Sequence, residues 1–149
     1  MIKKILHTQK DQAEEIRAVF QISYKVEAEL LGATSFPPLS RPLEEFSTCP
    51  NDFVGYYEDH KLVAVVEMKN EASSMHIQSL VVDPAYFRRG IARKLIDFVL
   101  QHYPIKQFTV ETGKENGPAR KLYESFGFEL LKTYTAEEGI LKVRYQKQL

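Results

Sequence analysis

Cysteine is almost absent from this chain, which has one, Cys49, among its 149 residues. A single cysteine excludes an internal disulfide and a cysteine-rich metal site, and it is typical of a reducing compartment. Nothing in the segment STCPND places a base or a helix N-terminus beside Cys49, so we expect an inert thiol rather than a nucleophile. His7, His60 and His102 are dispersed without the spacing of metal ligands. We therefore expect no metal.

The sequence also lacks an excess of either charge and any long apolar run. Twenty Lys and Arg residues balance twenty Asp and Glu residues, so the formal net charge is zero. A neutral chain has no overall field that favours nucleic acid or an anionic membrane surface, so any anion site must be local. The N-terminal segment becomes charged within a few residues, and no apolar run approaches membrane-spanning length. We expect a cytoplasmic protein without nucleic-acid or membrane partners.

Repeats, low-complexity tracts and Gly/Ser linkers are missing as well. The seven prolines and seven glycines are scattered, except in the segment LLGATSFPPLSRP, residues 30–42. With 44% hydrophobic residues, the chain is long enough to bury one substantial core. We expect a single domain over residues 1–149, interrupted by a proline-rich loop at residues 30–42.

Apolar periodicity changes repeatedly between that of strands and that of helices. Strands are predicted at residues 2–6, 52–59, 61–69, 74–82 and 107–112, and as a hairpin at residues 128–146 around Glu137–Gly139. Helices are predicted at residues 11–31, 41–46 and 117–126, and from Ile91 onward. The strand–helix–strand unit at residues 74–112 is long enough for a right-handed parallel crossover. The fold class is therefore α/β, a mixed sheet with helices on both faces.

The segment VVDPAYFRRGIA, residues 81–92, joins an apolar strand to a helix through a proline, two arginines and a glycine. A loop that enters a helix presents unpaired N–H groups at the positive end of the helix dipole, which favours an anion such as phosphate. Gly90 lets the backbone approach a ligand, and Arg88 and Arg89 add positive charge. The alternative is a solvated basic helix start. Neither a Walker loop nor a three-glycine Rossmann fingerprint is present in the sequence.

This segment resembles motif A of the GCN5-related N-acetyltransferase (GNAT) family, a strand that ends in V-x-P before a Q/R-x-x-G-x-G/A helix start. The segment NGPARKLYESFGF, residues 116–128, resembles the second family motif at the expected distance downstream. Phe87 departs from the pattern, because it stands at the Q/R position. The resemblance implies a mostly antiparallel sheet of about six or seven strands. It also implies an N-acetyltransferase that moves an acetyl group from acetyl-CoA to a primary amine by direct transfer in a ternary complex.

The resemblance implies a role for the backbone on both sides of Phe87. The strand segment of Leu80, Val81 and Val82 would pair with the pantetheine arm and polarise the thioester carbonyl. The loop and first helical turn would hold the phosphates of the co-substrate, through Arg88, Arg89, Gly90, Ile91, Ala92 and Arg93. Asn116 would meet the pantetheine or the nearby loop.

Acetyl transfer to an amine also needs a proton donor for the thiolate and a base for the amine. The resemblance implies that Tyr123 donates the proton, although a tyrosine on an apolar helix face is also an ordinary core residue. Glu111 is the first choice of base, because it resembles the glutamate at this spacing in bacterial ribosomal-protein N-terminal acetyltransferases. Glu67 and His76 on preceding strands are alternatives, and a register error of one residue would turn either away.

The acceptor amine is expected to approach from the first helix and the proline-rich loop, where family members vary. Carboxylates there could attract a cationic amine, and apolar side chains could form walls, namely Glu27, Glu29, Glu44 and Glu45 with Phe36 and Leu39. The sequence does not choose between a small-molecule and a peptide amine, or between a monomer and a homodimer. A different class remains open, a non-catalytic acyl-CoA-binding regulatory module that would not need Glu111 and Tyr123.

Overall fold

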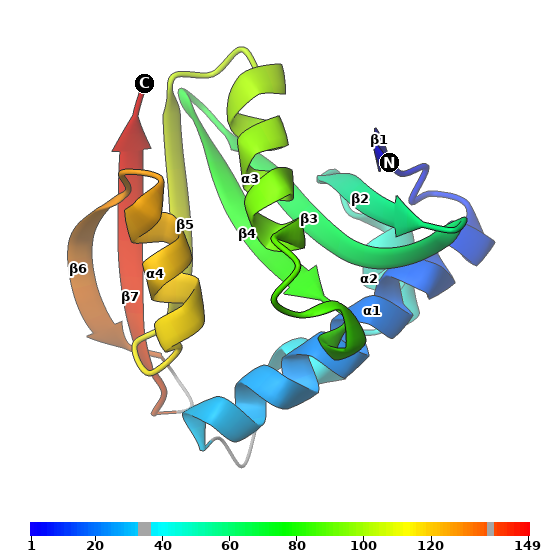
Figure 1. The fold of residues 1–149 in the computed structure, drawn as a ribbon, viewed down its shortest axis with the longest axis horizontal. Helices are drawn as coiled ribbons and strands as arrows, with labels where there is room; N and C mark the ends of the chain where they lie inside the picture. The colour runs from blue at the N-terminus through cyan, green and yellow to red at the C-terminus, as the bar shows by residue number, and fades with distance from the viewer. Residues whose placement is uncertain (33–36, 137–138) are drawn as a thin grey trace.

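A computed structural model describes residues 1–32, 37–136 and 139–149. Seven strands form one sheet in the order β1-β2-β3-β4-β5-β7-β6 (Figure 1). The strands are β1 Ile2–Lys4, β2 Asp52–Glu58, β3 Lys61–Glu71, β4 Ser74–Val82, β5 Gln107–Gly113, β6 Glu129–Thr135 and β7 Leu141–Gln148. The helices are α1 Lys10–Leu31, α2 Leu43–Thr48, α3 Ile91–His102 and α4 Gly117–Ser125, with short 3₁₀ turns at η1 Pro37–Ser40 and η2 Pro84–Tyr86.

The architecture confirms the predicted mixed, mostly antiparallel sheet. Among the strands of the described residues, β4 and β5 alone are paired in parallel, and α3 is the crossover between them. The predicted hairpin is present as β6 and β7, whereas part of its expected turn, residues 137–138, lies outside the described residues. It is β7, not β6, that pairs with β5, so the last strand of the chain lies inside the sheet and β6 forms its edge.

Helices cover both faces of the sheet, as predicted, and each face has its own core (Figure 1). On one face α3 buries Ile91, Leu95, Ile96 and Val99 at helical spacing. On the other face α1 packs with α2 around Phe20, which meets Phe46 edge to face at 4.9 Å between ring centroids. We call these the α3–α4 face and the α1 face. No helix within the described residues is long and apolar enough to cross a membrane.

The two parallel strands separate soon after they meet. Only three residue pairs join β4 to β5, from Met75–Phe108 to Ile77–Val110. Beyond these pairs the strands diverge, which leaves a V-shaped opening in the middle of the sheet (Figure 1). Because both strands continue past the last pair, each presents backbone groups along the opening.

A β-bulge in β4 sets which side chains face this opening. Met68 of β3 pairs with Ile77 and Glu67 pairs with Ser79, so Gln78 has no partner in β3. The extra residue reverses the alternation of the strand. Ile77 and Leu80 therefore both belong to the α3–α4 face, although three residues separate them.

Candidate active site

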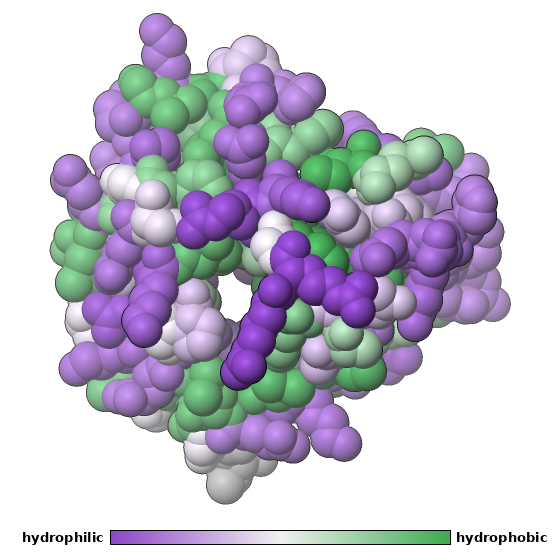
Figure 2. Space-filling model, in the orientation of Figure 1, coloured by the Kyte–Doolittle hydropathy of each residue, from purple (hydrophilic) through white to green (hydrophobic). Residues whose placement is uncertain are grey.

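A cleft of about 1100 Å³ occupies the opening between β4 and β5. Figure 2 shows the molecule hollowed at this place, between α4 and the loop that precedes α3. The cleft reaches both faces of the sheet, and we call its two parts the front half, on the α3–α4 face, and the back half, on the α1 face. The front half is lined by residues that include Leu80, Val82, Arg88, Ala92 and Tyr123. The back half is lined by residues that include Tyr24, Ser79, Glu111 and Lys142.

The loop before α3 has the backbone of an anion site. Asp83 accepts a hydrogen bond from the Ala85 N–H at 3.0 Å, which holds the turn η2 at the end of β4. Arg88 and Gly90 both have left-handed backbone, with φ of 64° and 74°. A Cβ built on Gly90 would meet no other atom within 4 Å, so its backbone angle rather than crowding favours glycine. The first N–H groups of the twelve-residue helix α3 begin directly after it.

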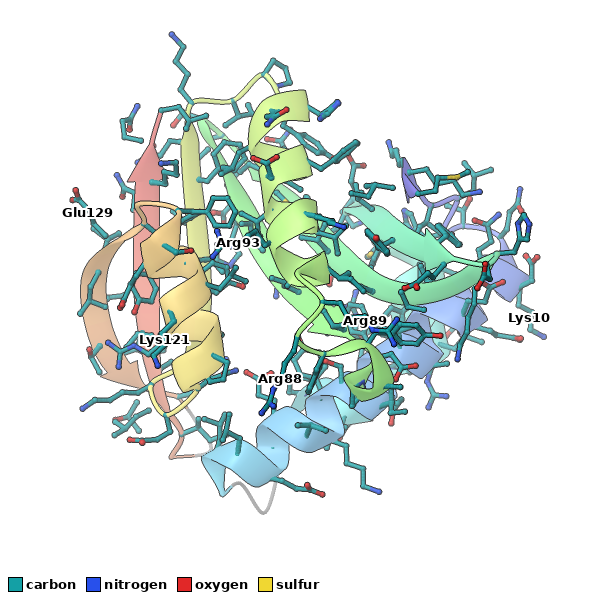
Figure 3. The ribbon with its side chains drawn as sticks, in the orientation of Figure 1. Lys10, Arg88, Arg89, Arg93, Lys121 and Glu129 are labelled. Atoms are coloured by element: carbon teal, nitrogen blue, oxygen red, sulfur yellow. The ribbon has the colours of Figure 1, made fainter. Side chains whose placement is uncertain are left out.

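The three arginines of this region have different surroundings (Figure 3). Arg88 lines the cleft and makes no hydrogen bond or ion pair with any residue in the described part of the chain. Arg89 pairs with Glu58 at 3.3 Å and lies over the Tyr86 ring. Arg93 donates to Ser125 Oγ at 2.8 Å, which links α3 to the end of α4. Arg88 is therefore the arginine of the three that is available to a ligand in the cleft.

The open edge of β4 presents alternate backbone groups to the cleft. The Asp83 N–H donates to the Val63 carbonyl at 2.8 Å, so by alternation Val81 also has its backbone partners in β3. The N–H and C=O groups of Leu80 and Val82 then point toward the opening. One of them already has a partner, since the Val82 N–H donates to Ser23 Oγ of α1 at 3.3 Å. The backbone groups of Leu80 and the Val82 carbonyl, rather than those of Val81, therefore form the available edge.

Asn116 joins the two faces at the cleft. Its Oδ1 accepts from the Ala119 N–H at 3.2 Å, which makes it the N-cap of α4. Its Nδ2 donates to Glu27 Oε1 of α1 at 3.1 Å. The motif residue therefore has a structural role as well as a place in the lining of the cleft.

Tyr123 lies on α4 with only 4% of its surface exposed. Its ring meets Phe128 edge to face at 5.7 Å between centroids, as an ordinary core residue would. Its hydroxyl makes no hydrogen bond to the described residues, and the side chain lines the cleft. Burial, together with the nearby Glu27 carboxylate and Tyr24, raises the pKa of Tyr123 above its ordinary value. The phenol therefore keeps its proton near pH 7, and the raised pKa makes it a weaker acid than an exposed tyrosine, so its role as the donor stays a prediction.

Glu111 lines the back half of the cleft, and both of its oxygens are engaged. Arg144 donates to one oxygen at 3.1 Å and Tyr134 donates to the other at 2.9 Å. Burial favours the protonated carboxyl, but these two hydrogen bonds and the Arg144 charge outweigh it and lower the pKa of Glu111. A lowered pKa makes a carboxylate a weaker base, and the role of Glu111 as the base stays a prediction.

The two alternative bases lie outside the cleft lining. Glu67 is fully buried and accepts from Arg41 at 2.7 and 2.9 Å, from Asn51 at 2.8 Å and from Ser79 at 3.1 Å. His76 is buried and its Nδ1 lies 2.7 Å from Thr109 Oγ1. Burial lowers the pKa of His76. The side chains of Glu67 and His76 are thus held by buried hydrogen bonds within the fold, and neither lines the front half of the cleft.

The buried pair of Glu67 with Arg41 supports a prediction on stability. We expect Arg41→Ala to lower the free energy of unfolding by about 3 kcal/mol, because it leaves the Glu67 charge buried with only neutral donors. Lys4→Ala, which removes the exposed pair with Asp52 at 3.2 Å, should cost less than about 1 kcal/mol. Urea unfolding of the three proteins measures both changes. Equal losses for the two variants would contradict the role of the buried pair.

The structure separates the acidic residues that were expected near the acceptor. Glu27 and Glu45 line the cleft, whereas Glu29 and Glu44 are exposed outside it. Of the two predicted apolar walls, only the one at Leu39 can be compared with the lining. Leu39 does not line the cleft, and Phe36 lies outside the described residues.

Cys49 also lies outside the cleft lining. Its Sγ accepts a long contact of 3.7 Å from Arg41, and burial raises the pKa of the thiol. A raised pKa leaves little thiolate, in line with the inert thiol expected from the sequence. Among residues 1–32, 37–136 and 139–149, no three His, Cys, Asp or Glu side chains are grouped as metal ligands would be.

Sequence reasoning missed several residues of the back half, among them Tyr24, Ser79, Thr112 and Lys142. Tyr24 and Ser79 are hydrogen-bonded to each other from α1 and β4. None of these residues belongs to a motif, and each reaches the cleft only through long-range packing. Helical spacing did place Phe20 and Ile16 on the buried face of α1, and Tyr24 follows Phe20 by one turn. That helical spacing is the signal in the sequence that could have placed Tyr24 at the cleft.

Comparison with known proteins supports the family resemblance. The family described as "Acetyltransferase (GNAT) domain" matches residues 20–149. The protein YqkA of Bacillus subtilis, described as a UPF0157 protein, is 33% identical over 142 residues, which are 95% of this chain. The chain spans 41% of the length of that relative.

Solved structures share the fold at low sequence identity. The ribosomal-protein-S18-alanine N-acetyltransferase of Escherichia coli has a TM-score of 0.77 and 17% identity, covering 99% of this chain and 92% of its own. The PaiA N-acetyltransferase of Thermoplasma acidophilum, solved with coenzyme A, has a TM-score of 0.74 and 17% identity, covering 100% and 99%. YncA of Salmonella typhimurium, a putative acetyltransferase solved with acetyl-CoA, has a TM-score of 0.75 and 12% identity, covering 100% and 93%. Because the family match extends over most of the sequence, this chain belongs to the GNAT acetyltransferase family.

Proposed function

We propose that the protein transfers an acetyl group from acetyl-CoA directly to the nitrogen of a primary amine while both substrates are bound. The main support for this proposal is the cleft that passes between β4 and β5. Its front half begins at the loop before α3, whose N–H groups would hold an anion, and its back half contains carboxylates. Such a passage lets a phosphate-bearing donor and an amine approach the same point from opposite faces of the sheet. Two structural neighbours were solved with coenzyme A or acetyl-CoA, which supports this donor.

The residues of the front half fit acetyl-CoA. Ile91 and Ala92, in the first turn of α3 after Gly90, line the cleft, and the N–H groups of this turn would hold phosphate oxygens. Arg88 would add a charge-assisted hydrogen bond, while Arg89 and Arg93 would stabilise the loop and α4 around it. The bound co-substrate supplies a thioester, whose acetyl group is already activated for attack.

The open edge of β4 would hold the pantetheine arm. Its amide groups can pair with the backbone of Leu80 and Val82 as a further strand would. Asn116 lies across the opening from this edge, in the lining of the cleft. Tyr123 would then donate a proton to the sulfur as the thiolate forms, because its phenol is neutral and lines the front half.

We propose that residues 1–149 act as one acetyltransferase domain on a small-molecule or peptide amine in the cytoplasm. The family match and the single sheet support one domain. The chain spans 41% of its Bacillus subtilis relative, so this proposal concerns the domain and not the activity of that longer protein.

Arg88 gives a prediction that separates phosphate binding from the rest of the co-substrate. Arg88→Ala should raise the dissociation constant for acetyl-CoA about tenfold, the effect of one charge-assisted hydrogen bond. It should leave the affinity for a pantetheine fragment without the nucleotide unchanged. Arg89→Ala is the matched control, since Arg89 is paired with Glu58. Calorimetric titration measures each affinity, and equal losses for both ligands would argue against phosphate binding by Arg88.

The function itself is tested by thiol release from acetyl-CoA in the presence of a panel of amines. The panel contains a peptide with a free N-terminus, a peptide with a lysine side chain, a polyamine, an amino acid and an aminoglycoside. We expect release that depends on at least one amine. Binding of CoA without acetylation of any amine would favour the regulatory module instead.

A further inference from the structure

Glu27 lies where the two halves of the cleft meet, and neither family motif contains it. It is a half-buried residue of α1 and one of the residues that line the cleft. Asn116 Nδ2 of α4 donates to its Oε1 at 3.1 Å. Thr112 of β5 and the positive charge of Lys142 on β7 are near enough to favour the ionised carboxylate. Groups from three other elements therefore surround one carboxylate of α1 in the passage between donor and acceptor.

The surroundings of Glu27 differ from those of Glu111 in a way that affects basicity. Neutral donors hold Glu27, whereas a guanidinium 3.1 Å away holds Glu111. Burial is the largest influence on Glu27 and raises its pKa, although the Asn116 hydrogen bond, the Lys142 charge and the nearby Thr112 hydroxyl oppose it. The pKa of Glu111 is lowered. Of these two carboxylates, Glu27 is the stronger base.

Glu27 is also close enough to affect the proton donor. Its negative charge is the second cause, after burial, of the raised pKa of Tyr123, and Tyr24 is the third. An ionised Glu27 thus opposes loss of the proton from the Tyr123 phenol. The two side chains come from α1 and α4, on opposite faces of the sheet, and both line the same cleft. One can accept a proton at the amine while the other donates one at the sulfur.

We propose that Glu27 is the base that accepts the proton of the acceptor ammonium in the proposed acetyl transfer, an inference that rests on that function. The N–H bond breaks with its electrons left on nitrogen, and the proton joins a Glu27 oxygen and then leaves to solvent. The nitrogen lone pair forms the C–N bond to the acetyl carbon, and the C–S bond breaks with its electrons on sulfur. Tyr123 gives sulfur a proton and regains one from the acetylated nitrogen. The acceptor is therefore an amine that binds as a cation.

Glu27→Gln tests this role with little change of shape, because the amide oxygen can still accept from Asn116. Glu29→Gln is the matched control on the same helix, since Glu29 is exposed and outside the cleft. With an amine found by the panel, Glu27→Gln should lower kcat/KM at pH 7 at least 100-fold. The affinity for acetyl-CoA should stay within about threefold, and the control should behave as the wild type.

The pH profile gives a readout that a structural role would not change. In the wild type kcat/KM should fall as pH decreases through the raised pKa of Glu27, because the base becomes protonated, and it should be level above that pKa. Without the base only free amine reacts, so in Glu27→Gln kcat/KM should rise tenfold per pH unit up to the amine pKa, about 10.4 for a lysine-like amine. In Glu111→Gln the fall of kcat/KM at low pH should occur at the same pH as in the wild type. The reason is that the pKa of Glu111 is lowered, so this carboxyl titrates below the pH range of that fall.

The pKa of Glu27 can also be measured in the free protein, without any substrate. Carbon-13 NMR titration of the Glu carboxyl groups in the free protein, with the Glu27 signal assigned by its loss in Glu27→Gln, should show a pKa for Glu27 above the ordinary value of a glutamate. An ordinary pKa together with an unchanged pH profile would overturn the assignment of Glu27 while the acetyl transfer stands. Acetylation of no amine by the wild type would instead overturn the proposed function.

Discussion

Replacing Gly90 with aspartate is expected to weaken acetyl-CoA binding at least about 100-fold, because a negative charge placed against a phosphate costs several kcal/mol. Gly90 is the N-cap of α3 with a φ of 74°, and the first N–H groups of the helix follow it at Ile91 and Ala92, two residues that line the cleft. The aspartate would compete for these groups, and it would face the pyrophosphate beside Arg88. Isothermal titration of acetyl-CoA into the two proteins measures the loss.

Two further variants separate charge from backbone strain. A Cβ at Gly90 meets no atom within 4 Å, so Gly90→Ala should suffer only the cost of a left-handed backbone, about 1–2 kcal/mol of stability, and should still bind. Gly32→Asp places the same charge at another open, left-handed glycine, with φ of 66°, at the end of α1. It should bind acetyl-CoA almost normally. Binding by Gly90→Asp that equals the binding by Gly32→Asp would rule out the anion loop.

Removing the Tyr123 hydroxyl should lower turnover by up to about 100-fold, the lower end of the range for a general acid, because a thiolate is a tolerable leaving group. Tyr123→Phe keeps the ring against Phe128 and removes only the proton at the cleft. Acetyl-CoA affinity should therefore remain intact while kcat falls. Steady-state kinetics with calorimetry distinguish these effects.

Tyr103→Phe is the control for loss of a phenol. The Tyr103 hydroxyl donates to Asp52 at 3.1 Å, and the residue does not line the cleft. This variant should lose about 1 kcal/mol of stability and no turnover. If Tyr123→Phe and Tyr103→Phe turn over at the same rate, Tyr123 is a core residue without a part in the proton transfer.

Much of the fold could be predicted because its signals are local. The crossover helix shows its buried stripe from Ile91 to Val99 within the sequence itself, and the proline and glycine on either side of Arg88 mark the loop. The pairing of β5 with β7 could not be predicted in this way, because hairpin strands look alike in sequence. The bulge at Gln78 is equally invisible, since it exists only through the register of β4 against β3.

The site was less predictable, because side chains of similar local sequence have different distant partners. Arg88 and Arg89 are neighbours, but Glu58 from the β2–β3 hairpin engages only Arg89. Spacing along the motif suggested Glu111, and its partners Arg144 and Tyr134 come from the last two strands. Glu27 reads in sequence as one more acidic residue of a helix. Its hydrogen bond with Asn116 joins residues 89 positions apart in the sequence. Local sequence patterns cannot predict a contact over that separation.

The central claim is most directly tested by the fate of the acetyl group. Acetyl-CoA labelled with carbon-13 at the acetyl carbonyl can be followed by NMR with the protein and each amine of the panel. We predict that the thioester signal is replaced by an amide signal for at least one amine, and that Gly90→Asp prevents this change at the same concentrations. A thioester that persists with every amine, or that becomes free acetate or an ester, would contradict acetyl transfer to nitrogen in this cleft.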